Sequence, residues 1–345
     1  MIDYRARFRI NLAIALCGLA VFAIVPFVAN SGLVFLAGLV AINIVFGLCW
    51  NFLFSGAGLL SFGHAMFFAA GAYGMAVVSL RMPELPFFLG LAFGSACGAL
   101  IAMIFGYIAL RRASGVYFAV LTLAFSELIH IYITKTTFLG RNDGLVGIPR
   151  PTIDLGPWVL DLTSATSYYY FIIVAMTIAA FALWCFQNSP AGRLIQAIRQ
   201  DPLRTAFLGA GIRGWQLTAF VVSGTIAAFC GAVMVPFTQI ASPEIAVWTV
   251  STQPILFTLL GGAGHFWGPA VGAILFGAIA YGTRAMQGLS DITVSVLLLT
   301  VVLLIPGGLL GLWQRRRRKA GGRQPGQAGD DARPGTAAGK VEARQ

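Results

Sequence analysis

Residues 189–216 read SPAGRLIQAIRQDPLRTAFLGAGIRGWQ, a polar stretch between two long apolar runs. Within it, Asp201 and Pro202 form a strong helix-start signal, because Asp caps free backbone N–H groups and Pro fits the first helical position. Residues 203–208 then predict a short helix, which Gly209 can end in a left-handed conformation. The stretch is either an ordinary cytoplasmic loop of a membrane protein or a helix that docks into another protein.

The composition places the rest of the chain in a membrane. Of its 345 residues, 58% are hydrophobic and 10% are charged, which excludes an ordinary soluble globular protein. The length suits a bundle of about ten spanning helices of about twenty residues each. We therefore expect an all-α integral membrane protein, a polytopic bundle of about ten transmembrane helices with a short cytoplasmic helix.

Apolar runs along the sequence are the candidate spans. The eighth run is the least regular, because Pro254 interrupts it and glycines follow it, so it either spans the membrane or re-enters as a broken helix. The runs cover residues 10–29, 33–54, 60–80, 87–110, 116–136, 168–187, 215–239, 245–261, 267–285 and 292–312.

Basic residues give the orientation of these spans. With a cytoplasmic N-terminus, the opening arginines, the pair Arg111 and Arg112, and the basic run 315–319 all lie on the cytoplasmic side, as the positive-inside rule requires. The same rule accounts for the net charge of +11 without a nucleic-acid partner. We expect a transmembrane domain over 1–313, containing the polar loop at about 189–214. A basic, low-complexity cytoplasmic tail over 314–345 should be disordered.

Small residues mark two expected helix contacts. Glycines recur every four residues in the fourth run, and a second pair of glycines has the same spacing in the ninth run. Such spacing lets helix backbones approach closely in membranes. These positions predict packing and no chemistry: Gly90, Gly94, Gly98, Gly268 and Gly272.

Polar side chains within the spans are candidates for a translocation path, since polar groups at membrane depth need partners and often line a path. Ser61 and His64 lie on a glycine-rich segment that follows Asn51 and Ser55. The alternative is a structural one, in which His64 caps a neighbouring helix.

Glu127 and His130 form a second polar pair, because residues three apart share a helix face. Their pairing inside a span suggests a functional site. Their position near Lys135, toward the external end, equally suits a hydrated structural pair. Glu127 is the single acid well inside a span, which disfavours a proton-coupled secondary carrier.

No motif points to catalysis. The one Gly-Lys pair, at 339–340, lacks the context of a phosphate-binding loop. The five cysteines fall within apolar spans without metal-site spacing. We therefore expect no catalytic residue, no metal and no cofactor.

Several stretches together resemble the permease subunits of ABC importers for branched-chain amino acids, the LivH/LivM permease family, and their order favours the LivM type. The likeness covers nearly the whole chain apart from the tail. It rests on GLLSFGHAMFFAAGAY (58–73), SGVYFAVLTLAFSELIH (114–130), NDGLVGIP (142–149), GRLIQAIRQDPLRTAFLGAGIRGWQLTAFVVSG (192–224), LLGGAGHFWGPAVGA (259–273) and IPGGLLGL (305–312).

The resemblance implies a permease of the bacterial inner membrane without an enzymatic site, with both termini in the cytoplasm. It would pair with a second, LivH-like permease and two cytoplasmic ATPase subunits that bind ATP, and would receive substrate from a periplasmic binding protein. A cytoplasmic loop helix would couple it to the ATPases. The residues in that role would be Arg199, Asp201, Pro202, Leu203, Ala206 and Gly209.

The chain departs from the family pattern in this helix, where relatives often have acids and paired alanines. This chain instead has Gln200, Pro202, Leu203, Arg204 and Thr205. Two alternatives to the branched-chain amino acid importer remain. One is a related ABC permease for urea, short amides or another small organic solute; the other is a stand-alone secondary carrier or channel.

Overall fold

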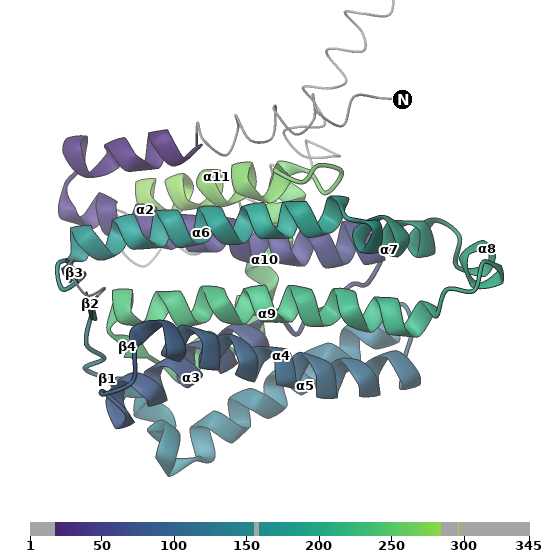
Figure 1. Ribbon diagram of the computed structural model, residues 1–345, viewed down its shortest axis with the longest axis horizontal. Coiled ribbons are helices and arrows are strands. Elements are labelled where there is room, and N and C mark those ends of the chain that lie inside the picture. Colours follow the sequence, from purple (N-terminus) through teal and green to yellow (C-terminus); the bar gives the residue numbers. More distant parts are fainter. Residues whose placement is uncertain (1–17, 155–158, 284–295, 297–345) are drawn as a thin grey trace, which may run out of the picture.

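The computed structural model describes residues 18–154, 159–283 and 296 (Figure 1). The expected last span, residues 292–312, lies outside the described residues except for Val296. The expected tail, residues 314–345, lies outside them entirely. A helix covers Gly18–Val28. The helices that follow are α2 (Ser31–Asn51), α3 (His64–Arg81), α4 (Phe87–Arg112), α5 (Val116–Lys135), α6 (Ala165–Asn188), α7 (Pro190–Gln200), α8 (Pro202–Phe207), α9 (Ile212–Thr238), α10 (Trp248–Gly261) and α11 (Gly268–Gly282).

The described chain is a helical membrane protein, as its composition predicts. Five of its helices are long and apolar enough to cross a membrane. The total of about ten spans stays a prediction. The five are Ser31–Ala57, which includes the π-helical turn η1 (Phe52–Gly56), and Phe87–Arg112, Val116–Lys135, Ala165–Asn188 and Ile212–Thr238.

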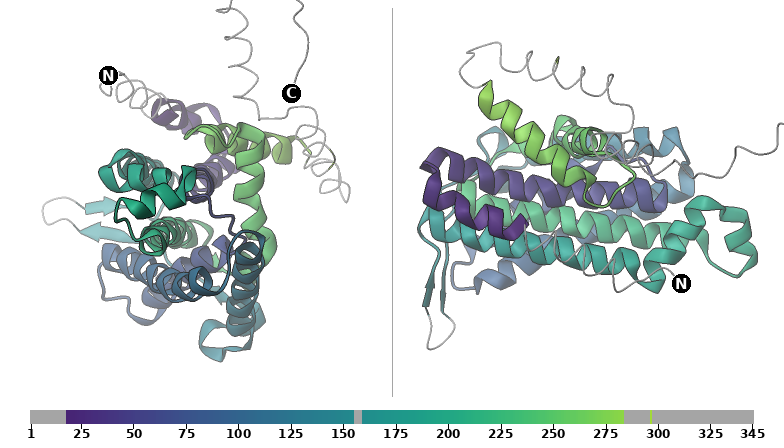
Figure 2. Two further views of the ribbon diagram at one scale, coloured as in Figure 1. Left: turned by 90° about the vertical axis from the view of Figure 1, so that its right-hand side faces the viewer. Right: turned by 90° about the horizontal axis from the view of Figure 1, so that it is seen from above.

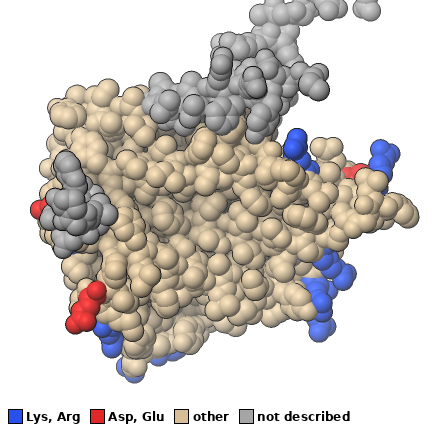
Figure 3. All heavy atoms as spheres, in the orientation of Figure 1, with Lys and Arg blue, Asp and Glu red and all other residues tan. Residues whose placement is uncertain are grey.

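The two ends of the bundle differ. At one end α7 and α8 project beyond the other helices (Figure 1). At the opposite end two short antiparallel ladders form: β1 (Leu145–Val146) pairs with β4 (Ile240–Ala241), and β2 (Thr152–Asp154) pairs with β3 (Val159–Asp161). On the face seen in Figure 3, charged side chains lie near these two ends and leave an uncharged band between them. This distribution fits a helix bundle that crosses a membrane along its long axis.

The core of the bundle is formed by α3, α4 and α9, which pack closely on one another. The glycines of α4 lie at this contact: an added Cβ at Gly94 would come 2.6 Å from the Gly71 oxygen, and one at Gly98 would overlap the Cβ of Ala228. Gly90 contacts α3 at Met75. On α11, an added Cβ at Gly272 would overlap the Phe257 backbone of α10, and one at Gly268 would overlap the Gly262 oxygen. The small residues therefore let backbones meet.

Helical structure is interrupted between α2 and α3. The apolar run predicts a helix from Leu60, but α3 begins at His64. Before it, α2 continues into the π-helical turn η1, which ends at Gly56. The helix ends at Ala57, and Gly58 follows it with φ +72°. Residues 58–63 then return into the bundle as an irregular segment. Irregular backbone inside a membrane protein requires buried partners for its polar groups, and these are described below.

The eighth apolar run forms a helix that lies across the bundle. Figures 1 and 2 show α10 running at a steep angle to α9 and the other long helices, between the layer containing α2 and α11 and the layer containing α3. Its 14 residues correspond to about 21 Å, which is shorter than a hydrocarbon core of about 30 Å. Pro254 lies inside the helix without ending it, and Gly262 follows its last residue at φ +111°.

Candidate functional site

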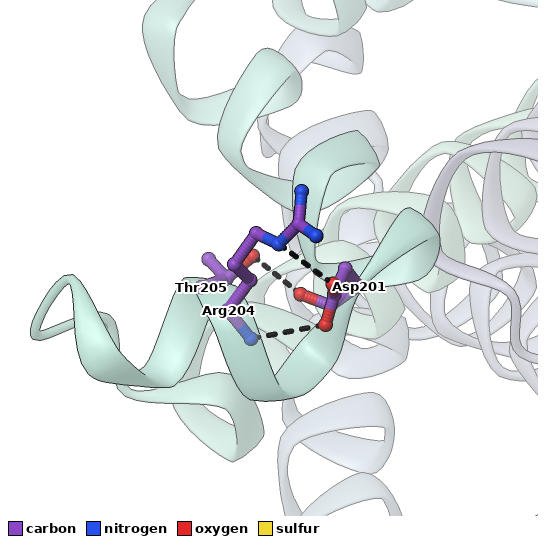
Figure 4. Close-up of polar contacts among 3 residues, drawn as sticks. All are labelled: Asp201, Arg204 and Thr205. Carbon is purple, nitrogen blue, oxygen red and sulfur yellow. Dashed lines mark hydrogen bonds and ion pairs between the residues drawn. The ribbon is translucent and has the colours of Figure 1, made fainter.

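The projecting end of the molecule is built by two short helices, α7 and α8. Asp201 joins them and caps α8: its Oδ1 accepts a hydrogen bond from the Arg204 backbone N–H at 3.0 Å. Its Oδ2 lies 3.1 Å from Arg204 Nε, and its carbonyl accepts from the Thr205 hydroxyl at 2.8 Å (Figure 4). Pro202 occupies the first turn. The sequence prediction that α8 starts at this Asp-Pro pair agrees with this geometry.

The other end of α8 is closed by Gly209, which has φ +86°. Its N–H donates to the Ala206 carbonyl at 2.9 Å, and the Ala210 N–H donates to the Thr205 carbonyl at 3.3 Å. These two bonds make a Schellman cap, which requires a left-handed residue and favours glycine. A helix of six residues would be unstable alone, so the two caps hold α8 together.

Apolar side chains cover the tip of α8. Leu203 is 73% exposed, Phe207 90% and Leu208 86%. Thr205, in contrast, is buried against the rest of the segment. Burying such side chains against another protein is favourable at about 1.5–3 kcal/mol each. The tip therefore has the character of a docking surface.

α7 anchors this tip to the bundle. Ser189 caps its start by accepting from the Gly192 N–H at 3.2 Å, and Ile195 and Ile198 are buried. Near its end, the Arg199 guanidinium donates to the main-chain oxygen of Ser55. Arg199 therefore contacts the C-terminal end of the α2–η1 helix while remaining exposed, and it is not part of the apolar tip.

The predicted path residue Asn51 lies next to Ser55, the residue that Arg199 of α7 contacts. Asn51 Nδ2 donates to the His265 carbonyl at 3.0 Å. Ser55 Oγ lies 2.6 Å from both Asn51 Oδ1 and the Ala263 carbonyl. The end of α2 is thus bonded to the loop that joins α10 and α11.

His64 and Ser61 lie deeper, at the start of α3. His64 is fully buried, and its Nε2 lies 2.9 Å from Ser223 Oγ near the middle of α9. The Ser223 hydroxyl donates to the Cys49 carbonyl at 2.8 Å. Since a hydroxyl has one proton, we infer that His64 Nε2 carries the proton shared with Ser223.

The irregular segment before α3 finds its partners on three other helices. The Ser61 carbonyl accepts from Trp50 Nε1 at 2.8 Å on α2. The Phe62 N–H donates to Thr122 Oγ1 at 3.1 Å on α5. The Ala65 N–H donates to Ser251 Oγ at 2.8 Å on α10. The Ser61 hydroxyl accepts from the Gly63 N–H at 3.2 Å within the segment. A place for Ser61 and His64 on a translocation path stays a prediction.

Glu127 and His130 occupy α5, which is inclined to the other long helices (Figure 1). His130 Nδ1 lies 3.2 Å from the Pro243 carbonyl of η4 (Pro243–Ala246). Glu127 is partly buried, and its Oε2 is buried without a hydrogen-bond partner in the described part of the chain. The two residues share a face, as predicted, but His130 bonds a neighbouring element.

Sequence reasoning missed the hydrogen-bonding partners Thr122, Ser223 and Ser251. Single Ser and Thr residues are common in membrane helices, so nothing in the apolar runs distinguishes these three. Their importance follows from the irregular segment at residues 58–63, which the sequence did not predict.

Comparison with known proteins identifies the family. The family described as "Branched-chain amino acid transport system / permease component" matches residues 32–306. The chain is 27% identical over 322 residues to the high-affinity branched-chain amino acid transport system permease protein LivM of Escherichia coli K12, covering 88% of this chain and 75% of that protein. It is 26% identical, with the same coverage, to the LivM protein of Salmonella typhimurium LT2. No solved structure has significant similarity to the chain.

Proposed function

The chain belongs to the family of branched-chain amino acid transport permeases, and on that premise we propose that it is a permease subunit of an ABC importer. It carries branched-chain, aliphatic amino acids across the bacterial inner membrane into the cytoplasm. ATP hydrolysis in two partner ATPase subunits drives the transport. This chain supplies no ATPase site of its own.

The observation that carries this proposal is the exposed, doubly capped α8. A short helix with Leu203, Phe207 and Leu208 exposed at its tip is suited to a cleft in a cytoplasmic ATPase. Because Asp201 and Gly209 fix both of its ends, a displacement of α8 is transmitted as rigid-body motion and is not absorbed by the loop. ATP binding moves the helix, and the bundle alternates between outward-open and inward-open states.

The remaining partners follow from the same proposal. A second, LivH-like permease completes the translocation path between the two subunits, and a periplasmic binding protein delivers the amino acid. The end that carries α7 and α8 faces the cytoplasm, and the ladders β1–β4 and β2–β3 face the periplasm. No cofactor is required by this chain.

The test is uptake by the complete complex in proteoliposomes. We expect labelled leucine, isoleucine and valine to enter with ATP and the loaded binding protein, and uptake to stop when the ATPase subunits are inactivated. Uptake that instead collapses with a protonophore would identify an ion-driven carrier. If the complex instead preferred urea or short amides, it would be an importer of those solutes and not of branched-chain amino acids.

A single substitution tests the role of α8. Phe207→Asp places a charge on the apolar tip and should reduce co-purification of the ATPase subunits by about tenfold, because burying an unpaired carboxylate is costly. Gln200→Asp is the matched control, since it adds the same charge at an exposed position of the same segment. Equal co-purification of the two variants would contradict docking through the tip.

A further inference from the structure

Arg199 lies close to α8 in sequence but contacts η1, at the C-terminal end of α2. Its guanidinium donates to the Ser55 main-chain oxygen. Its aliphatic stem packs on Gly58, where an added Cβ would come 3.0 Å from Arg199 Cγ. Asp201 and Pro202, which start α8, follow Arg199 almost directly in sequence. A displacement of α8 therefore also moves Arg199, which is bonded to the end of α2.

The acceptor of this bond stands at the end of a helix. The last carbonyls of a helix lack partners within it, and a cation there also interacts favourably with the helix dipole. Ser55 belongs to η1, the π-helical turn that ends at Gly56, and Gly58 follows the end of the helix with φ +72°. π-Helical turns are strained insertions that are frequent at functional sites. Arg199 therefore stabilises the C-terminal end of α2 where the chain breaks.

The Ser55 side chain connects this end to a third element. Its Oγ faces two acceptors at 2.6 Å each, Asn51 Oδ1 within α2 and the Ala263 carbonyl in the α10–α11 loop. A hydroxyl has one proton, so the bond to the loop can be exchanged for one inside α2 without leaving Ser55 unpaired. The Ser55 hydroxyl thus has two alternative hydrogen bonds, one to Ala263 and one to Asn51. An element with two discrete arrangements can transmit a conformational change between distant sites.

We propose that Arg199 and Ser55 form a latch that transmits displacement of α7 and α8 to the break between α2 and α3 and to the α10–α11 loop. This inference rests on the proposed function of α8. Arg199 is in this view a positioning residue that acts inside the permease and has no contact with the ATPase. The motion reaches α10 through the loop, and α10 in turn bonds the start of α3 through Ser251.

The experiment measures leucine taken up per ATP hydrolysed by the complete complex in proteoliposomes. Arg199→Met and Ser55→Ala should each lower this ratio by about three- to tenfold, a range typical of residues that modulate coupling. ATPase co-purification should be unchanged. Arg199→Lys should restore most of the ratio, because a lysine ammonium can donate to the same carbonyl. The double variant should be no worse than either single one, because the two act in one connection.

Arg193→Met is the matched control, since Arg193 is an exposed arginine on the same helix, α7. It should retain the wild-type ratio. A wild-type ratio in Arg199→Met, or additive losses in the double variant, would overturn the latch. Loss of the ATPase subunits from Arg199→Met would place Arg199 in the docking surface and also overturn it.

A second measurement separates the latch from the transport function. Hydrogen exchange of the purified full chain should be several-fold faster at residues 57–59 in Arg199→Met than in Arg193→Met, because the helix end loses its cap. Equal exchange in the two variants would reject the latch whatever the complex transports. Failure of the wild-type complex to take up leucine would reject the proposed function and leave the exchange result to decide on the latch.

Discussion

At the scale of single residues, this chain uses a few polar side chains to hold an irregular segment inside an apolar bundle. Unpaired polar groups are costly in such surroundings. The start of α3 accordingly has partners on several helices, among them Ser223 and Ser251. These contacts hold His64 buried inside the bundle, and its role in a translocation path stays a prediction.

Substitution of His64 should distinguish lost volume from a lost hydrogen bond. His64→Ala should lower the free energy of unfolding by about 2–4 kcal/mol, because it leaves a cavity and removes the partner of Ser223. His64→Gln should lose about half as much, since its terminal amide can take the position of the Nε2 donor. Thermal unfolding of the full chain in detergent measures both. Equal losses for Ala and Gln would mean that the bond to Ser223 contributes little.

Substitutions of Asp201 distinguish two sources of stability for α8, the N-cap and the ion pair with Arg204. Its ion pair with Arg204 joins side chains that are 45% and 86% exposed, and such pairs contribute little. Loss of an N-cap, in contrast, costs about 0.5–2 kcal/mol. We therefore expect Asp201→Ala to accelerate hydrogen exchange across residues 203–207, and Asp201→Asn, which caps without charge, to leave it nearly unchanged. Faster exchange in both variants would assign the stabilisation to charge.

At the scale of elements, α3 and α9 pack backbone to backbone in the core. An added Cβ at Gly71 would overlap the Ala228 main-chain oxygen, which cannot move aside as a side chain does. Gly71→Ala should therefore separate α3 from α9 and lower the free energy of unfolding by about 1–3 kcal/mol. Gly214→Ala is the control on α9, since Gly214 has open space around it, and it should be neutral or stabilising. Denaturation of both variants in detergent gives the comparison; a neutral Gly71→Ala would contradict this packing.

The elements also show how far the sequence predicts the fold. Apolar length and glycine spacing predict α4, α6 and α9 within a few residues, because burial in a membrane depends on local composition. The Asp-Pro start and glycine end predict α8 for the same local reason. The prediction is wrong for the start of α3, because the break depends on Thr122 and Ser251, whose positions are set by distant parts of the chain.

At α10, a local sequence signal suggested an interruption that the helix does not have. Pro254 favours an interruption in a local interpretation, yet α10 continues through it. Proline inside a membrane helix is tolerated where neighbours or side chains satisfy the freed backbone groups. Near it, the Thr258 hydroxyl donates to the Pro254 carbonyl at 2.8 Å. The direction of α10 across the bundle (Figure 2) follows from its contacts with α2 and α11, which no local pattern contains.

At the scale of the whole molecule, the candidate site divides between two regions. The tip of α8 is exposed, and its geometry is specified by nearby sequence. The polar contacts of Asn51, Ser55 and His64 lie inside the bundle and join segments far apart in the chain. The proposed mechanism requires both regions, because force applied at α8 has to reach the helices that surround the path.

The proposal finally requires one orientation of the molecule in the membrane. In a variant whose five cysteines are replaced by serine or alanine, we introduce single cysteines at Phe207 and at Val146. Both side chains are exposed, at 90% and 63%, and the two lie at opposite ends of the bundle. A membrane-impermeant maleimide added to right-side-out vesicles should label position 146, and position 207 should react only in inverted vesicles. Labelling of position 207 from the periplasmic side would place α8 away from any cytoplasmic ATPase and would remove the physical basis of the coupling proposed for it.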